Sequence, residues 1–419
     1  MSGAEVSEAI TQAHRLEWAR VVASLTRRFG DLDVAEEAAA EAFATAVERW
    51  PAEGVPPRPG AWLTTTANRK AIDRLRRENK RDDKHREANR MYGDPASEPR
   101  GAIDDDRLRL MFICAHPALA MDSRVALTLR LIGGLSVPEI AQAFLVQEGA
   151  LAQRITRAKA KIKANRIPYR VPEAEDLPMR LSGVLAVLFL IFNEGYLATG
   201  PSSDPLRPEL TAEAIRLTRM LRSLLPEDGE VAGLLGLMLL TEARSAARMS
   251  SHGELIPLAD QDRQAWNVAM IAEGHRIIRE RLDSGVAPAP YQILAAINAV
   301  HTSARTMGDT DWCQIVALYD QLAHLDPSPV VALNRGIAVA ELDGPSVGLA
   351  LIEPLSTELA DYHPYHAARA DLLRRAGRER EARAAYDAAI GLAGNSAEVA
   401  YLSRRRDELH APADGKIQP

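Results

Sequence analysis

The stretch Ser136–Lys163 constrains the fold most, because it encodes two short amphipathic helices and the break between them. Ser136 is followed by Pro138 and Glu139, which is the pattern of an N-cap, a first-turn proline and a capping box. The break falls near Leu145–Gln147. The second helix repeats apolar residues along one face, at Leu151, Ile155, Ala158 and Ile162. This pattern predicts a helix-turn-helix motif.

The solvent-facing side of the second helix is polar and basic. It carries Gln147, Glu148, Gln153, Arg154, Arg157 and Lys161. From Leu151 to Arg170 the chain has seven basic residues and no acidic one. In a recognition helix, exposed arginines and N-terminal side chains read base edges, while later lysines contact phosphates. An ordinary helical hairpin with a basic rim is the alternative, but the agreement of cap, break, stripe and charge favours binding to duplex DNA.

A second nucleic-acid signature lies in Ala61–Arg77. At helical period one face is apolar, with Leu63, Ala67, Ala71 and Leu75. The opposite face holds Trp62, Thr65, Arg69, Asp73 and Arg76. An exposed aromatic ring beside guanidinium groups is how proteins hold unpaired nucleic acid. A plain amphipathic helix, with a half-buried tryptophan and solvated arginines, is the alternative.

The helix before this stretch has an acidic outer face. Asp33 is placed to be its N-cap, and Pro51 is expected to end it. Its inward residues are Phe43, Ala46, Val47 and Trp50, and its outward residues are Glu36, Glu37, Glu41 and Glu48. Such a face is either a solvated surface or a docking surface for a basic partner.

Length and charge divide the chain. Its 419 residues are too many for one core, so we expect two or more domains. Residues 1–170 hold 28 Lys and Arg against 23 Asp and Glu, a net charge of +5, and residues 171–419 hold 23 against 34, a net charge of −11. Ala, Leu, Arg and Glu dominate, which favours helix throughout. A basic front and an acidic back indicate that only the front contacts nucleic acid.

The last third of the chain repeats itself at an interval of 34 residues. The matched positions are Gly336 with Ala370, Ile352 with Tyr386, and Leu355 with Ala389. This interval is the period of tetratricopeptide repeats, whose helix pairs stack into a superhelix with a concave binding face. The tail after about His410 is expected to be disordered.

Membrane segments and catalytic motifs are not expected. The longest apolar run, Val184–Phe192, predicts a buried helix segment, and Gly195 fits the end of that helix. No stretch reaches the length of a membrane span. We find no signal peptide, phosphate-binding glycine loop or nucleophile elbow, so a cytoplasmic protein without enzymatic activity is expected. Cys114 and Cys313 are far apart in the sequence, and His363 with His366 are read as surface residues, so neither pair predicts a metal site.

Several of these stretches resemble the extracytoplasmic-function sigma factors of bacterial RNA polymerase. Ala35–Phe43 and Trp62–Arg77 resemble their domain two, and Leu127–Lys163 resembles their domain four. The rest resembles the subgroup with a long tetratricopeptide-like C-terminal extension, through Phe192–Tyr196, Gln261–Arg263, Ser328–Val331 and Arg369–Leu373.

The resemblance implies an all-α protein of five parts. These are sigma domain two as a helical bundle over residues 1–85, a linker over 86–104, sigma domain four with the helix-turn-helix over 105–170, the C-terminal extension over 171–410, and a disordered tail over 411–419. Activity would be modulated by the extension, which would be a positive, intramolecular part of the factor.

The resemblance also implies a promoter-specificity subunit with no cofactor, whose partners are core RNA polymerase and promoter DNA. Core polymerase would contact Glu36, Glu37 and Glu41. The unpaired minus-ten element would be held by Trp62, Asn68, Arg69, Asp73, Arg76 and Arg77. The duplex minus-thirty-five element would be read by Gln147, Glu148, Gln153, Arg154, Arg157 and Lys161. A regulatory protein on the extension would be a further partner, and no membrane is implied.

Two departures from the family pattern bear on these roles. Ala40 stands where the family usually has Gln, and Gln147–Ala150 opens a helix that begins with Ser or Thr in many relatives. Two other functions stay open. One is a helix-turn-helix regulator that acts without core polymerase, and the other is a repeat-based protein-interaction adaptor.

Overall fold

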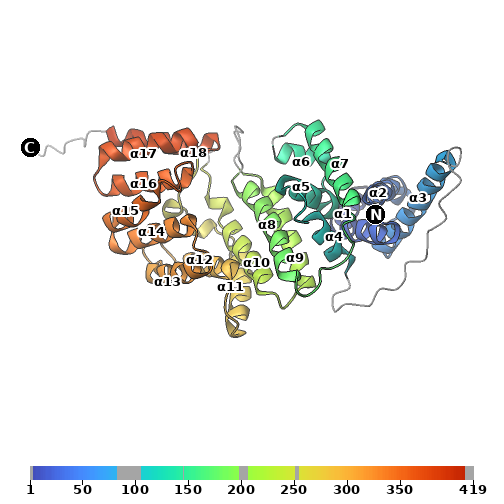
Figure 1. Ribbon diagram of the computed structural model, residues 1–419, viewed down its shortest axis with the longest axis horizontal. Helices are drawn as coiled ribbons and strands as arrows, with labels where there is room; N and C mark the ends of the chain where they lie inside the picture. The colour runs from blue at the N-terminus through green and yellow to red at the C-terminus, as the bar shows by residue number, and fades with distance from the viewer. Residues whose placement is uncertain (1–2, 83–104, 145, 198–205, 251–253, 411–419) are drawn as a thin grey trace, which may run out of the picture. The chain divides into compact units, whose positions relative to one another are not determined.

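The computed structural model describes residues 3–82, 105–144, 146–197, 206–250 and 254–410. Within these ranges every regular element is a helix, apart from an isolated antiparallel bridge between Met249 and Leu255 (Figure 1). The chain forms two compact units, unit one over Met1–Ile191 and unit two over Phe192–Pro419. The expected all-α class is therefore confirmed. The expected linker over residues 86–104 and the tail over 411–419 lie outside the described ranges.

Unit one begins with three packed helices. They are α1 (Gly3–Phe29), α2 (Leu32–Glu53) and α3 (Pro59–Asp82). The N-cap of α2 is Asp31, whose carboxylate accepts hydrogen bonds from the backbone of Asp33 and Val34, so the expectation of Asp33 as the N-cap was wrong by two residues. The helix also continues past Pro51. Val47, expected to face inward, is 55% exposed.

The second half of unit one contains the helix-turn-helix. Its elements are α4 (Asp106–Cys114), α5 (Met121–Leu127), the π-helix η1 (Thr128–Gly133), α6 (Val137–Ala143) and α7 (Glu148–Ala164). The predicted capping box of α6 is present. The Ser136 hydroxyl accepts from the backbone N–H of Glu139, and the Glu139 carboxylate accepts from that of Ser136. The stripe Leu151, Ile155, Ala158 and Ile162 is buried as predicted.

The helix α8 (Leu177–Tyr196) contains the boundary between the two units. Its first part belongs to unit one, where Arg180 donates to the carbonyl oxygen of Phe112 at 2.7 Å. By length and composition alone α8 could span a membrane, with a mean hydropathy of 1.5, whereas the sequence analysis found no stretch of that length. Seven of its apolar side chains are buried in the fold, namely those of Leu181, Val184, Leu185, Val187, Leu188, Ile191 and Phe192. A core helix passes the same test of length and composition.

Gly195 serves a purpose other than ending α8. A Cβ atom at this position would lie 2.6 Å from the backbone nitrogen of Thr211 and 2.9 Å from the carbonyl oxygen of Arg207. The backbone N–H of Arg207 donates to the carbonyl oxygen of Gly195 at 2.8 Å. The glycine is therefore needed for close approach between α8 and the start of α9.

Unit two continues with helices around a central one. These are α9 (Pro208–Leu224), α10 (Gly229–Glu242), α11 (Val268–Asp283), α12 (Pro290–Ser303) and α13 (Trp312–Leu325). Three short 3₁₀ turns lie between α10 and α11, at Ser245–Ala247, Leu258–Asp260 and Arg263–Ala265. The helix α10 is buried from Val231 to Thr241, because α9, α11 and α12 all pack on it. A helix that is apolar on every side requires such a position.

Helix pairs then follow one another along the chain. They are α14 (Pro329–Asp343) with α15 (Pro345–Ile352) and α16 (His363–Arg375) with α17 (Glu379–Leu392), followed by α18 (Ser396–Asp407) (Figure 1). Both helices of the second pair begin 34 residues after their counterparts, at 363 against 329 and at 379 against 345. Gly336 allows the tight contact within the first pair, since a Cβ there would lie 2.5 Å from the side chain of Ile352. The interval read from the sequence is thus the interval between helix starts.

Candidate nucleic-acid and polymerase interface

The outer face of α7 presents most of the residues expected to read duplex DNA. Gln147, Glu148, Gln153, Arg157 and Lys161 are exposed. Arg154 is partly buried, with its Nη1 atom 3.7 Å from a carboxylate oxygen of Asp122 on α5. Because the apolar stripe of α7 anchors the opposite side, these side chains lie together on one surface of a fixed helix.

On the polar face of α3, four of the residues expected to hold DNA are exposed. Arg69, Asp73, Arg76 and Arg77 are exposed. Asn68 is partly buried, where it accepts a hydrogen bond from Arg28 at 3.3 Å and donates to the carbonyl oxygen of Thr64 at 3.0 Å; these two contacts orient its amide.

Trp62 of α3 was expected to be exposed, but its side chain is half buried. It makes an edge-to-face contact with the buried Trp50 of α2, with ring centres 5.5 Å apart. Such a contact holds the indole in one orientation. The alternative reading of a half-buried tryptophan describes its position better than full exposure.

Glu36 does not lie on an open acidic face, contrary to the sequence analysis. It is 8% exposed, and its carboxylate binds two cations of the helix-turn-helix half. Arg130 Nε donates to Glu36 Oε1 at 2.5 Å, and Lys159 Nζ donates to Glu36 Oε2. The physical reason is tertiary: the side chains of Arg130 on η1 and Lys159 on α7 reach the N-terminal end of α2. A sequence signal existed, because Glu36 is seven residues before the inward Phe43 and so lies on the same helix face.

The same contact extends to two further carboxylates at the start of α2. Lys159 Nζ lies 2.8 Å from Asp33 Oδ1, and Lys163 Nζ lies 3.0 Å from Asp31 Oδ2. We call Asp31, Asp33, Glu36, Arg130, Lys159 and Lys163 the ion-pair cluster. These contacts were not predicted from the sequence. Lys159 follows Ile155 by four residues and precedes Ile162 by three, so its position beside the buried stripe was the available signal.

Two members of the cluster, Lys159 and Asp31, have pKa values shifted toward the charged form. Burial opposes the charged form of Lys159, but the carboxylates of Glu36 and Asp33 outweigh it and raise the pKa of the ammonium group. Burial likewise opposes the charged form of Asp31, but hydrogen bonds from Lys163 and from the backbone of Val34 and Asp33 lower the pKa of that carboxyl. Both groups are therefore ionised around neutral pH.

The remaining acidic residues of α2 stay accessible. Glu37 pairs with Arg74 of α3, and Glu41 lies 3.6 Å from Lys70, with side chains 49% and 42% exposed. Exposed pairs of this kind contribute little to stability and exchange partners readily. Glu37 and Glu41 are thus open to a basic partner, whereas Glu36 is already engaged.

Comparison with protein families assigns both halves of unit one. Residues 17–81 match the family model Sigma-70 region 2, and residues 109–162 match Sigma-70, region 4. Residues 180–282 match a family of unknown function (DUF6596). The chain is an extracytoplasmic-function sigma factor with a C-terminal extension. Region 2 corresponds to α1–α3, and region 4 to α4–α7.

Whole-chain comparison gives a relative of similar length. The sigma factor is 43% identical over 406 residues to an uncharacterized protein of Rhizobium meliloti (strain 1021), covering 94% of each chain. No solved structure matches it. Sigma factors are DNA-binding factors for promoter recognition and transcription initiation, and their families are non-enzymatic.

The remaining histidine pair has ordinary structural contacts. His363 Nδ1 lies 3.8 Å from a carboxylate oxygen of Glu398, and His366 Nε2 lies 2.7 Å from the carbonyl oxygen of Ala360. The two rings thus engage different partners.

Proposed function

We propose that this cytoplasmic sigma factor divides promoter binding between α3 and α7 and contacts core RNA polymerase through α2. The observation that carries the proposal is the outer face of α7, where exposed polar and basic residues sit on a helix anchored by a buried stripe. A rigid helix of this kind suits the major groove of duplex DNA. The exposed arginines of α3, on the same helix as the Trp62 ring, suit an unpaired strand.

Arg154 and Lys161 of α7 provide the test of duplex reading. Arg154→Ala should relax base preference at one or two upstream positions, because a bidentate contact contributes about 1–3 kcal/mol of discrimination. Lys161→Ala should weaken binding to all sequences alike and reduce the salt dependence. Promoter selection from a randomised library, using holoenzyme, measures both. Identical preferences for Arg154→Ala and the parent would remove Arg154 from base reading.

Core binding is proposed to use Glu37 and Glu41, with Glu36 available only after the ion-pair cluster opens. Changing Glu37 and Glu41 to Lys should abolish co-purification with core polymerase while helical content is kept, since both side chains are exposed. Glu48→Lys, further along α2, is the matched control. Undiminished core binding by the double variant would move the docking surface elsewhere.

Co-purification with core polymerase also tests the two alternative functions, a regulator that acts without core polymerase and a repeat-based adaptor. A helix-turn-helix regulator would bind duplex DNA without associating with core polymerase, and a repeat-based adaptor would bind neither. Run-off transcription with purified core polymerase on genomic fragments separates a sigma factor from both, because only a sigma factor makes initiation depend on its addition.

The C-terminal extension is proposed to modulate activity from within the same chain. Its net charge of −11 makes it poorly suited to DNA and well suited to a protein surface. That surface would be either the basic part of this chain or a separate regulatory protein. In both cases, the extension would act on promoter recognition without contacting DNA.

A further inference from the structure

A cavity of about 300 Å³ lies within unit two, away from the residues assigned to DNA or polymerase. Its walls come from the end of α8, the segment after α10, and the helices α16 and α18. The lining combines an apolar side, Leu255–Leu258 with Leu402, and a polar side that includes Arg244, Arg248, Gln261, His363 and Glu398. The volume is that of a small-molecule site.

Arg248 is the unusual member of this lining. It is only 7% exposed, its guanidinium carbon lies 3.4 Å from the ring centre of Tyr196, and Nη1 donates to the carbonyl oxygen of the same residue. Arg244 donates from Nη2 to the side chain of Asn298 at 3.1 Å. Across the described ranges, neither guanidinium has a carboxylate within ion-pair distance.

The nearby carboxylates are engaged elsewhere. Glu254 binds Arg404 at 2.7 Å, and Glu398 is held by the amide of Asn395 at 3.0 Å. Burial, followed by the positive charge of Arg244, lowers the pKa of Arg248, and the carboxylate of Glu242, which accepts hydrogen bonds from Thr211 and Ser245, only partly offsets this. A buried cation whose nearest carboxylates lie beyond ion-pair distance is costly, because it loses hydration that its remaining partners only partly replace.

Three further polar atoms around the cavity are buried without a hydrogen-bond partner in the described part of the chain. They are Arg244 Nε, Gln261 Oε1 and His363 Nε2. Buried polar atoms nearly always find partners, so three beside one cavity indicate a bound group that supplies them. Arg244 Nε requires an acceptor, whereas Gln261 Oε1 requires a donor.

We propose that this cavity binds a small organic acid that carries a hydroxyl or amino group. The carboxylate would accept from Arg244 and Arg248, the donor group would face Gln261 and His363, and the apolar part would pack on Leu255–Leu258 and Leu402. This inference goes beyond the proposed function, because the extension would bind a small molecule in addition to modulating promoter recognition.

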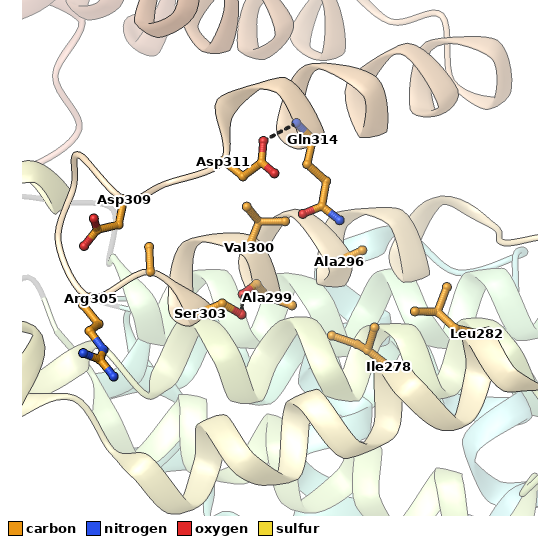
Figure 2. A pocket seen from close by; sticks show the side chains of 11 residues that line it. Ile278, Leu282, Ala296, Ala299, Val300, Ser303, Arg305, Asp309, Asp311 and Gln314 are labelled. Carbon is orange, nitrogen blue, oxygen red and sulfur yellow. Dashed lines mark hydrogen bonds between the residues drawn. The ribbon is translucent and has the colours of Figure 1, made fainter.

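A second cavity in unit two, of about 470 Å³, lacks these features (Figure 2). Ile278 and Leu282 of α11 and Val300 of α12 line it, and its charged residues are exposed to water, namely Arg305, Asp309 and Asp311. Its charges therefore need no ligand. The comparison shows that cavity size alone does not single out the first site.

The test uses the full chain with three probes. Phenyllactate carries all three proposed groups, inorganic phosphate carries the charge without the apolar part, and 2-phenylethanol lacks the charge. We expect 10 mM phenyllactate to raise the unfolding temperature by several degrees at constant ionic strength, with a smaller rise for phosphate and none for the alcohol. Calorimetric titration then gives the dissociation constant.

Two variants test whether phenyllactate binds in this cavity. Arg244→Gln and Arg248→Gln should each weaken phenyllactate binding at least tenfold, and the second variant keeps the test valid if the first does not fold. Arg219→Gln on α9 removes the same charge from an exposed ion pair with Glu273 and should bind like the parent. The proposal is overturned if neither anion binds the parent, or if folded Arg244→Gln or Arg248→Gln binds as tightly as Arg219→Gln.

Discussion

At the scale of single residues, Lys159 has the most specific position. Its side chain is 10% exposed and contacts two carboxylates of α2 from the recognition helix. Replacement by Met should cost about 1–3 kcal/mol of unfolding free energy, because Glu36 would keep only Arg130 as a charged partner. Urea unfolding measures the change. Lys161→Met, which removes an exposed lysine two residues later, should stay within about 0.5 kcal/mol of the parent.

The predicted loss of unfolding free energy would be wrong if Lys159 contributed no stability. Equal unfolding midpoints for Lys159→Met and Lys161→Met would mean that the contact between α7 and α2 does not persist in solution. The two variants carry the same change of charge and the same change of side chain, so helix propensity and net charge cancel.

Asp31 gives the contact a pH dependence of known sign. Its pKa is lowered from the ordinary value of 3.8, so its contribution to stability is fully present above 3.8 and disappears as the pH falls through the lower folded value. Asp31→Asn should therefore lower the unfolding temperature at pH 7, and the difference from the parent should shrink below pH 3.8. Asn also caps helices through its side-chain oxygen, so a difference that is constant between pH 7 and pH 3 would mean that the charge of Asp31 is not the cause.

At the scale of elements, close helix contacts depend on glycine. Gly195→Ala would place a methyl group against the backbone of Thr211 and Arg207, which cannot move without shifting α9. We expect a loss of about 1–3 kcal/mol, measured by thermal or urea unfolding. Gly391→Ala in α17 is the matched control. With no atom within 4 Å of its added methyl, that variant should be neutral or more stable. A neutral Gly195→Ala would mean that α8 and α9 separate easily.

At the scale of the whole molecule, the two units suggest where to truncate the chain. Cutting after Leu197 keeps α8, including its hydrogen bond from Arg180 to region 4, and removes most of unit two. If the extension is a positive part of the factor, the truncated protein should bind core polymerase yet fail to initiate transcription on a cognate promoter. A truncated protein more active than the full chain would show that the extension inhibits.

The sequence by itself was sufficient for features that depend on neighbours along the chain. The capping box at Ser136 and Glu139, the stripe of α7 and the 34-residue interval all follow from local hydrogen bonding and helical period. The outward positions of Arg69, Arg157 and Lys161 follow from the same period, because a residue opposite a buried stripe faces water.

Only the tertiary structure decided which polar groups meet across the fold. Helical period places Glu36 and Lys159 near the edge of a buried stripe, but it does not say that they face each other over a separation of 123 residues. The same holds for Gly195, whose role is set by the backbone of α9, and for Arg248, whose burial depends on the cavity around it. Pairing of this kind is determined by packing between helices, because contact energies between distant residues leave no periodic signal in the chain.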